Sequence, residues 1–571
     1  MSNHSRPLRF GIMCTDTNFP AWEASCIRQL MTLNAAVPKL LIMDTRKSGW
    51  VAAVRQTGLN KVLGLMHRRV IALPEAMRSV DLSTELGGLK RVKCTVRLEG
   101  KYSEWFSDDD ISQIREFDLD FILRFGFNII RGDILDVPKY GVWSFHHGDE
   151  AKYRGSPPAF WEIYDGDPVT GSILQRLTDR LAGGVVLKKG FFPTTNYSYT
   201  SNLNRVLTDS AAWPAKVCTD IRNGNAQYLV GKPRKVDAPI HKLPTNRQLM
   251  IFVYITWKNL ITKLLQLFFR HEEWNIGIAN VPISSFVNAK TLPEIQWLPS
   301  RTQGHYVADP FGIVDGNLMV IQCEEFDYWT SRGIISKLAG RDVASIVACG
   351  PVFDMQHHLS YPYLLRHEGE HYCIPESSEA RHVKLYKATP TLSRWEEVAT
   401  LLSNFAAVDS TVVKHNGRWW LFCTNADDGR QDKLFLWHAE TLHGPWQPHL
   451  CNPVKIDVRS ARPAGTPFVH NGNLYRPSQD CSVTYGGRVS LNRVTKLTTT
   501  AFEEVVCNTI GPDVDGIYGD GMHTLSQLGE EKTLVDGKLY RFHAGGFSQA
   551  LKFVVRSGYS KIGFRHNSDS G

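Results

Sequence analysis

Several patterns that commonly identify a protein's chemistry are absent from this 571-residue sequence. Its eleven cysteines include no Cys-x-x-Cys pair or His-Cys cluster, so we predict no metal site and expect reduced, mostly structural thiols in a cytoplasmic protein. No GxGxxG or GxxxxGK(S/T) motif follows a predicted strand, which disfavours dinucleotide-binding and P-loop proteins. The 65 basic side chains only slightly outnumber the 57 acidic ones, which disfavours a dedicated nucleic-acid binder.

Long apolar runs are also scarce. The first residues form no apolar secretory segment with a cleavage site, and the longest apolar stretch, residues 248–270, is interrupted by Lys258 and Lys263. We therefore expect neither secretion nor a true membrane span. The stretch is apolar over a wide arc of a helix, with its basic residues on the remaining arc. It fits a peripheral helix at the inner face of a membrane, with its basic side toward anionic lipid, or a connector that packs one domain on another.

The length predicts two or three domains, because a single core rarely grows past about 250 to 300 residues. From Leu8 to about Ala238, short apolar runs alternate with amphipathic stretches, and residues 10–14 and 39–44 are predicted to be buried strands with a helix between them. This alternation indicates a mostly parallel sheet, whose ligands bind at the carboxyl ends of its strands. We predict an α/β domain at residues 1–235, a basic linker and amphipathic helix at 236–274, and a third region at 275–571.

The third region repeats a hairpin pattern. Each copy has an apolar strand, a tight turn containing glycine and a second strand, and the turns lie at Gly316, Gly369, Gly417 and Gly472, with a weaker fifth copy at Gly537. Asn-Gly and Asp-Gly turns between apolar strands favour hairpins, and a recurrence of roughly 50 residues is typical of one propeller blade. We therefore predict an all-β five-bladed propeller at 275–571, with an irregular β-sandwich as the alternative.

The densest polar segment is GVWSFHHGDEAKYRGSPPAFWEIYDGDPVTG, residues 141–171, and LTDRLAGGVVL follows at 177–187. These motifs resemble the formyltransferase family, which includes methionyl-tRNA formyltransferase and the sugar N-formyltransferases. The family has a G-x-x-N-x-H loop, a YRG-x-x-P turn, a Gly-Asp-x-x-Thr-Gly segment and a final Asp-x-Gly. The resemblance implies a Rossmann-like α/β domain in which His146 is catalytic and the turn residues Tyr153, Arg154 and Gly155 bind substrate.

Two positions depart from the family's catalytic set of Asn, His and Asp, which becomes Ser144, His146 and Ala182 here. Formyl transfer needs a base for the amine, a donor for the oxyanion and a carboxylate that orients the histidine. Ser144 still offers one donor, whereas Ala182 cannot orient anything. Asp149 and Asp179 are the nearest alternative carboxylates in the sequence, and each either reaches His146 or is a solvated loop residue. Because of these changes, 10-formyltetrahydrofolate is a possible but not a required donor, and the cofactor is otherwise unassigned.

YVADPFGIV at residues 306–314 and the Glu324-Glu325 pair carry a second resemblance, over residues 275–564. The region resembles the five-bladed glycosidase-type propellers of arabinanases and invertases. It is more similar still to the amino-terminal, non-glycosyltransferase domain of plant glucosamine inositolphosphorylceramide transferase.

The first residues of inner propeller strands point toward a central funnel, which here offers Asp309, Tyr361, Asp409, Arg462 and His523. Glycoside cleavage needs two carboxylates across the bond, one acting as acid and the other as base or nucleophile. Asp309 and Asp409 are candidates, with Glu325 or Glu376 as the acid. The same side chains can instead bind a glycan without cutting it, or hold the blades together by hydrogen bonds.

Together these features predict a transferase of the formyltransferase family that acts on a carbohydrate, such as an amino sugar or a glycan intermediate of surface polysaccharide or glycolipid assembly. The expected partner is a sugar nucleotide or a glycan and not a nucleic acid. Two alternatives stay open: a 10-formyltetrahydrofolate-dependent sugar N-formyltransferase with a repaired catalytic set, and a noncatalytic glycan-binding protein.

Overall fold

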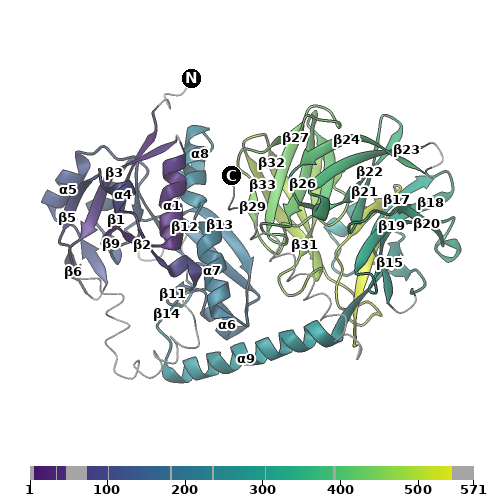
Figure 1. Cartoon of the computed structure of the whole chain (residues 1–571), viewed down its shortest axis with the longest axis horizontal. Coiled ribbons are helices and arrows are strands. Elements are labelled where there is room, and N and C mark those ends of the chain that lie inside the picture. Colours follow the sequence, from purple (N-terminus) through teal and green to yellow (C-terminus); the bar gives the residue numbers. More distant parts are fainter. Residues whose placement is uncertain are drawn as a thin grey trace, which may run out of the picture. The chain divides into compact units, whose positions relative to one another are not determined.

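The computed structural model describes residues 6–542 apart from residues 34, 47–73, 101, 180–182, 234–236, 302–303, 390–391 and 393, so Ala182 lies outside the described residues. The chain divides into two compact units, Met1–Lys258 and Asn259–Gly571 (Figure 1). The division falls inside helix α9 (Asn246–Phe269), and this helix confirms the one predicted at 248–270. The assignment of separate regions to residues 1–235, 236–274 and 275–571 stays a prediction.

The first unit is built on a seven-stranded sheet with the order β13-β12-β10-β8-β1-β3-β5. The pairs β1–β3, β1–β8, β3–β5 and β8–β10 are parallel, whereas β10–β12 and β12–β13 are antiparallel. The predicted strands at 10–14 and 39–44 are confirmed, because they lie within β1 and β3. The sheet consists of β1 (Leu8–Cys14), β3 (Ala36–Asp44), β5 (Lys90–Cys94), β8 (Phe121–Arg124), β10 (Val142–His146), β12 (Val169–Arg176) and β13 (Val185–Pro193).

Helices and small strand pairs surround this sheet. The described helices of the unit are α1 (Ala21–Thr32), α4 (Ser83–Leu86), α5 (Asp108–Arg115), α6 (Trp161–Asp165), α7 (Tyr199–Ser210) and α8 (Trp213–Arg222), with 3-10 turns η1 (Glu75–Met77), η2 (Asp133–Asp136) and η3 (Gln227–Val230). The small sheets pair β2 (Asn18–Pro20) with β4 (Ser79–Asp81), β11 (Arg154–Gly155) with β14 (Ile240–His241), and β7 (Ser103–Trp105) with both β6 (Arg97–Glu99) and β9 (Ile129–Arg131).

Both faces of the central strands are buried, as their unbroken apolar runs require. Phe121 stacks on Phe10 and on Trp143 across neighbouring strands, with ring centroids 5.2 and 4.0 Å apart. Because side chains alternate along a strand, Ile122 lies on the opposite face, where it belongs to one apolar cluster with Ile114 of α5. The parallel strands therefore present their carboxyl ends from a rigid, doubly covered layer.

The described part of the second unit forms five antiparallel sheets. Four of them follow the chain in order: β17 to β20, β21 to β24, β25 to β28 with β29 beside β27, and β30 to β33. The first two strands of each are joined by a turn whose glycine has a positive φ, so the four hairpins predicted at Gly316, Gly369, Gly417 and Gly472 are confirmed.

The strands of these four sheets are β17 (His305–Asp315), β18 (Leu318–Asp327), β19 (Arg332–Gly340), β20 (Val347–Phe353), β21 (Ser360–His367), β22 (Glu370–Glu376), β23 (His382–Ala388), β24 (Trp395–Ser403), β25 (Ala407–His415), β26 (Arg418–Asn425), β27 (Lys433–Ala439), β28 (Gln447–Pro448), β29 (Lys455–Ile456), β30 (Phe468–His470), β31 (Asn473–Asp480), β32 (Arg488–Leu497) and β33 (Phe502–Ile510). Short 3-10 turns lie at η4 (Ile283–Val287), η5 (Val343–Ser345) and η6 (Ser378–Ala380).

The fifth sheet joins both ends of the unit. From the beginning of the unit, β15 (Arg270–Ala279) and β16 (Ile295–Trp297) pair in the order β16-β15-β35-β34 with β34 (Leu525–Leu528) and β35 (Lys532–Phe542) from its end. The predicted turn at Gly537 is wrong, because Gly537 lies inside β35 and the chain turns at Gly529, whose φ is +64°. Gly537 is needed for close packing instead, since a Cβ there would lie 2.4 Å from Trp297.

Candidate functional site

In the first unit, His146 lies at the carboxyl end of β10, beside the end of the parallel strand β8. Ligands of doubly wound α/β folds bind at this edge of the sheet. The Nε2 atom of His146 is 2.8 Å from the carbonyl oxygen of Tyr153. Because a carbonyl only accepts, Nε2 carries the proton and Nδ1 carries the lone pair. Burial lowers the pKa of His146, so its ring is neutral near neutral pH.

Ser144, two residues earlier on β10, is held by Arg124 at the end of β8. Its Oγ accepts hydrogen bonds from Arg124 Nε at 3.0 Å and Nη2 at 2.8 Å, and it donates to the carbonyl of Phe145 at 3.4 Å. Arg124 Nη1 in turn donates to the carbonyls of Phe127 and Asn128. The hydroxyl of Ser144 is therefore fixed by its neighbours and is not a free donor for an oxyanion.

The two alternative carboxylates make other contacts. Asp149 is buried and accepts a hydrogen bond from Lys189 Nζ at 2.8 Å; burial would raise its pKa, but the Lys189 charge lowers it. The side chain of Asp179 is 67% exposed and lies 4.0 Å from Arg131. Within the described residues neither carboxylate hydrogen-bonds to His146. The carbonyl of the YRG turn, rather than a carboxylate, therefore orients the histidine in this structure.

The predicted substrate-binding turn at residues 153–155 pairs with the short strand β14. Gly155 has a φ of +98°, and a Cβ there would lie 2.0 Å from the carbonyl oxygen of His241, so only glycine fits. Arg154 Nη1 donates to a backbone carbonyl in the segment before β14 at 3.1 Å. These contacts fix the backbone of Tyr153, whose carbonyl orients His146. The turn thus has a positioning role, while its contact with substrate stays a prediction.

Two side chains that the sequence analysis does not single out belong to this edge of the sheet. Burial raises the pKa of Glu23 to about 8, although the charge of Arg124 opposes the rise. A neutral carboxylic acid therefore lies near the guanidinium that holds Ser144. A charged residue within the apolar run FILRFGF, residues 121–127, is the signal that could have identified Arg124, because such charges are rarely buried without a partner.

In the second unit, the first strands of three sheets share one backbone feature. Asp309, Tyr361 and Asp409 lie at equivalent bulges in β17, β21 and β25, with φ angles of +51°, +43° and +55°. Such angles cost about 1–3 kcal/mol in residues other than glycine and persist where the surroundings enforce them. The three backbone N–H groups donate to buried carboxylates of Asp536, Asp309 and Glu376, respectively, at 3.0 to 3.2 Å. The strain directs three predicted site residues into one polar network.

Asp409 and Arg462 form a buried ion pair in this network. Arg462 Nε lies 2.5 Å from Asp409 Oδ2 and Nη2 lies 3.2 Å from Oδ1, while Gln479 donates to the same carboxylate at 2.8 Å. Burial raises the pKa of Asp409 to about 6, although Arg462 opposes the rise. For Arg462 burial acts to lower the pKa, but Asp409 raises it well above its ordinary value. The hydroxyl of Tyr361 accepts from the N–H of Gly465 at 2.6 Å, which joins β21 to the segment before β30.

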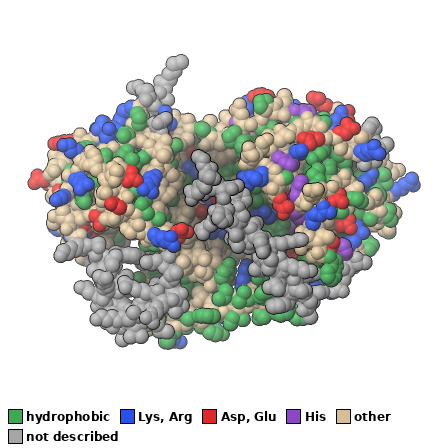
Figure 2. All heavy atoms as spheres, viewed as in Figure 1, with side chains coloured by type: hydrophobic (Ala, Val, Ile, Leu, Met, Phe, Trp, Pro, Cys, Tyr) green, Lys and Arg blue, Asp and Glu red, His purple; other side chains and the backbone are tan. Residues whose placement is uncertain are grey.

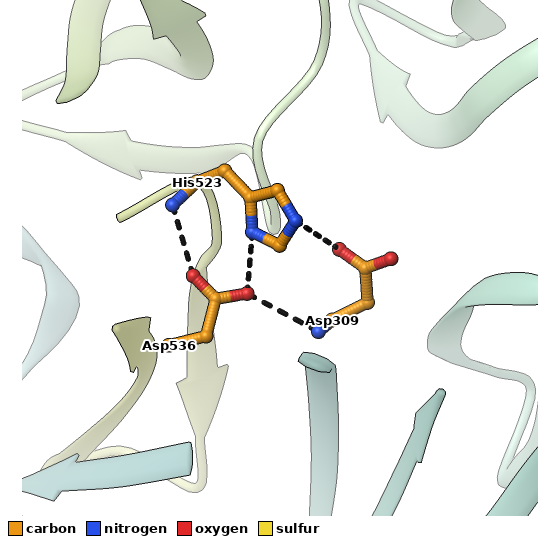
Figure 3. A group of neighbouring side chains, drawn as sticks. All are labelled: Asp309, His523 and Asp536. Atoms are coloured by element: carbon orange, nitrogen blue, oxygen red, sulfur yellow. Dashed lines mark hydrogen bonds and ion pairs between the residues drawn. The ribbon is translucent and has the colours of Figure 1, made fainter. Parts of the chain in front are cut away.

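His523 lies between two carboxylates, Asp536 and Asp309, as Figure 3 shows. Its Nδ1 is 2.6 Å from Asp536 Oδ2 and its Nε2 is 3.7 Å from Asp309 Oδ1. The ring of Trp274 stacks on His523 with centroids 3.9 Å apart. Burial acts to lower the pKa of His523, but the charges of Asp536 and Asp309 raise it above its ordinary value. Burial also raises the pKa of Asp309 to about 6, although His523 opposes the rise. The geometry is that of an imidazolium held between two carboxylates.

The same three residues offer ligand atoms within 4.8 Å of one another, a spacing compatible with a metal ion. The donor set does not fit one. Asp536 Oδ1 accepts the N–H groups of His523 and Thr524 at 2.9 Å each, and Oδ2 accepts from Asp309 N at 3.1 Å and from His523 Nδ1. Four donors use the lone pairs of this carboxylate, and His523 lowers its pKa against the effect of burial. Asp536 is therefore an ionised anchor for His523.

Glu324, rather than the predicted acid Glu325, belongs to the buried group. Successive side chains of β18 point to opposite faces, so Glu324 is buried opposite Ala308 while Glu325 is half-buried on the other face. Burial and the charges of Asp309, Glu376 and Asp409 raise the pKa of Glu324 well above its ordinary value. The other predicted acid, Glu376, is buried and accepts from Ser378 Oγ at 2.9 Å. A neutral acid, Glu324, thus lies near Asp309 and Asp409, whose pKa values of about 6 leave them partly ionised near neutral pH.

The chain is similar to two kinds of curated protein. Residues 272–513 match the family model for the amino-terminal part of glucosamine inositolphosphorylceramide transferase 1. The rice (Oryza sativa subsp. japonica) protein of that name is 35% identical over 210 residues, which are 36% of this chain and 28% of the relative. Methionyl-tRNA formyltransferase from Agathobacter rectalis is 27% identical over 145 residues, 24% of this chain and 45% of the relative. The chain therefore spans less than half of either relative's length.

A solved structure is also similar. A family 117 glycoside hydrolase from Zobellia galactanivorans aligns with 48% of this chain and 91% of its own, at 11% identity and a TM-score of 0.31.

Of the polar network, Asp309, Tyr361, Asp409 and Arg462 lie inside the segment that matches the transferase family model, whereas His523 and Asp536 follow it.

Proposed function

We propose that the protein is a transferase that acts on a carbohydrate, namely an amino sugar or a glycan intermediate of surface polysaccharide or glycolipid assembly. The observation that carries this proposal is the buried network around Asp309 and Asp409, which lies in the segment similar to the plant transferases. Carboxylates accept hydrogen bonds from sugar hydroxyls and arginine donates them, so a polyhydroxyl ligand would bind by exchanging the bonds that Asp409 and Arg462 make with each other for bonds to the sugar. A cytoplasmic location belongs to the proposal, because buried thiols such as Cys323 and Cys373 are typical of proteins kept in a reducing compartment.

The fold proposed for this activity is a Rossmann-like formyltransferase domain followed by a closed five-bladed propeller. In support of the propeller, β17 contacts β21 and β34, and β21 contacts β25, so the first strands of successive sheets are neighbours. The sheet that pairs β15 with β35 joins the two ends of the unit, as closure of a ring requires. In support of the Rossmann-like domain, β1, β3, β5, β8 and β10 pair in parallel.

We assign group transfer to His146. Transfer of a formyl or similar acyl group to an amine forms a bond from the amine nitrogen to the carbonyl carbon, breaks the bond from that carbon to the donor, and releases a proton from the amine. The neutral Nδ1 of His146 accepts this proton, while the Tyr153 carbonyl keeps the ring in the required tautomer. Because Ser144 is held by Arg124, the oxyanion lacks the side-chain donor that formyltransferases use.

Incubation of the purified full chain with nucleotide-sugar or formyl donors and with amino-sugar or glycan acceptors tests the proposal, with mass spectrometry of the acceptor as the readout. Transfer should fall at least tenfold in His146→Gln, and substrate affinity should fall in Asp409→Asn. His443→Gln, which changes an exposed histidine, should match the wild type. Absence of transfer from every donor class, or full activity of His146→Gln, contradicts the proposal.

A noncatalytic glycan-binding protein is the second candidate. It is favoured by the contacts of Ser144 and of the carboxylates Asp149 and Asp179, which leave the first unit without the usual oxyanion donor and orienting acid. Calorimetric titration with monosaccharides and amino sugars separates the two candidates. Sugar binding that survives His146→Gln, is lost in Asp409→Asn and is accompanied by no transfer supports the binding protein.

A further inference from the structure

Helix α9 carries an apolar stripe that remains exposed in the described part of the chain. Its members Met250, Tyr254, Trp257, Ile261, Leu264 and Leu265 are between 44% and 68% exposed. At about 100° per residue they all fall within about 60° of Met250, so they lie on one side of the helix over about four turns. In Figure 2 hydrophobic side chains gather along the position of α9. Single exposed apolar side chains are normal, whereas a contiguous stripe marks an interaction surface.

The opposite side of α9 packs within the first unit. Phe252 is 3% exposed and stacks on Phe160 with centroids 4.2 Å apart, and Tyr199 contacts it edge-on at 6.0 Å. At about 100° per residue, Phe252 points roughly 160° away from Met250. Packing of this face accounts for Phe252 and its neighbours, but it does not account for the exposed stripe.

We propose that the exposed stripe of α9 docks on an anionic phospholipid bilayer, with the helix lying flat in the membrane–water interface. No helix among the described residues is long and apolar enough to cross a membrane. Residues 246–269 contain no acidic residue, and Arg247 and Lys258 lie about 60° and 80° from Met250 around the helix axis, so they border the stripe and match the negative charge of a cytoplasmic leaflet. Tyr254 and Trp257 supply rings with one apolar and one polar end, which favour this interface.

A second copy of the helix is the other candidate occupant. Helices that pair along an apolar seam usually place charges of both signs beside it. Residues 246–269 carry one sign only, so two copies would bring like charges together. Lipid is therefore favoured over self-association. This membrane contact is independent of the transferase activity.

Co-sedimentation of the full chain with vesicles tests the contact. The wild type should bind vesicles of phosphatidylcholine mixed with phosphatidylserine at least tenfold more tightly than phosphatidylcholine alone, since each basic side chain near an anionic surface contributes roughly fivefold. Trp257→Glu/Ile261→Glu should weaken that binding at least tenfold. The matched control Val230→Glu/Val514→Glu introduces the same charges at residues that are 86% and 77% exposed, and it should bind like the wild type.

Equal thermal midpoints of the two double variants and the wild type show that the changes leave the fold intact. Failure of the wild type to bind anionic vesicles overturns the proposal, and so does equal binding by Trp257→Glu/Ile261→Glu and the wild type. Sedimentation equilibrium supplies the third outcome. A dimer that Trp257→Glu/Ile261→Glu dissociates, without any vesicle binding, assigns the stripe to a second copy and refutes lipid docking.

Discussion

Replacing Arg462 with methionine removes the cation from a buried ion pair of the second unit. Asp409 then loses the hydrogen bonds from Nε at 2.5 Å and Nη2 at 3.2 Å and keeps the one from Gln479. The side chains of Arg462 and Asp409 are 7% and 2% exposed, so water does not replace the lost bonds. Breaking such a pair from one side costs about 3–5 kcal/mol. At about 2 °C per kcal/mol for a unit of this size, we expect the melting temperature to fall by about 6–10 °C.

The loss of stability in Arg462→Met should grow as the pH rises. Burial already raises the pKa of Asp409 to about 6 in the presence of Arg462, and removal of the cation raises it further. When the pKa of a carboxyl is higher in the folded than in the unfolded protein, its cost to the stability of the protein is smallest below the unfolded pKa. That cost grows as the pH rises through the folded pKa. The difference between wild type and Arg462→Met should therefore be small near about pH 5 and large near about pH 8.

Scanning calorimetry of the full chain measures this difference, with the same transition compared in each protein because the two units need not unfold together. Arg459→Met is the matched control. Arg459 also makes two 2.8 Å bonds to a carboxylate, that of Asp457, but its side chain is 41% exposed, so its loss should cost about 0–1 kcal/mol. Arg462→Met/Asp409→Asn should recover part of the lost stability. A melting temperature of Arg462→Met within about 2 °C of wild type near about pH 8 would refute the reasoning, and so would a loss that does not depend on pH.

Two further predictions concern the same unit. Gly465→Ala should cost at least about 3 kcal/mol of stability, because φ is +120° and a Cβ would lie 2.0 Å from the carbonyl oxygen of Leu525. In the control Gly472→Ala the new Cβ meets no atom within 4 Å, so this change should cost about 1–2 kcal/mol. Equal melting temperatures of the two variants would contradict this prediction. Asp536→Asn should lower the pKa of His523, whose raised value depends first on the Asp536 charge, and an NMR titration of the labelled ring that shows no decrease would disprove the anchoring role. Because the pKa of His523 is raised on folding, its stabilising contribution is full at low pH and is lost as pH rises through that pKa.

The hairpins of the second unit were predictable because their signal is local. Gly316, Gly369, Gly417 and Gly472 lie in turns that need a positive φ, and glycine adopts it without strain. The same signal failed at Gly537. An Asp-Gly pair also occurs inside a strand when the aspartate is needed in a buried network and the glycine leaves room for a neighbouring ring. Asp309, which donates to Asp536, and Trp297, which packs on Gly537, are both more than 200 residues away in the sequence, so no local pattern distinguishes the two cases.

For the site residues, too, local sequence patterns identified several members but not all of their contacts. The predicted residues Asp309 and His523 approach each other, and the predicted Arg462 pairs with Asp409. Glu324, and not the predicted acid Glu325, lies in the buried group, because one residue of strand register decides which face a side chain takes. In the first unit, His146 lies at the end of its strand as the motif indicates. Its orienting partner is a backbone carbonyl, which a motif of side chains does not identify.

The alternation of strands and helices in the first unit, the repeated hairpins of the second and the amphipathic character of α9 were predictable from the amino-acid sequence. These follow from turn conformations and from the periodicity of apolar residues, which depend on neighbours in the chain. Three further properties required the folded chain: which carboxylates ionise, which acid lies among them and which hydroxyl is already hydrogen-bonded. Those properties depend on burial and on charges brought together from strands more than 200 residues apart, such as Asp309 and His523.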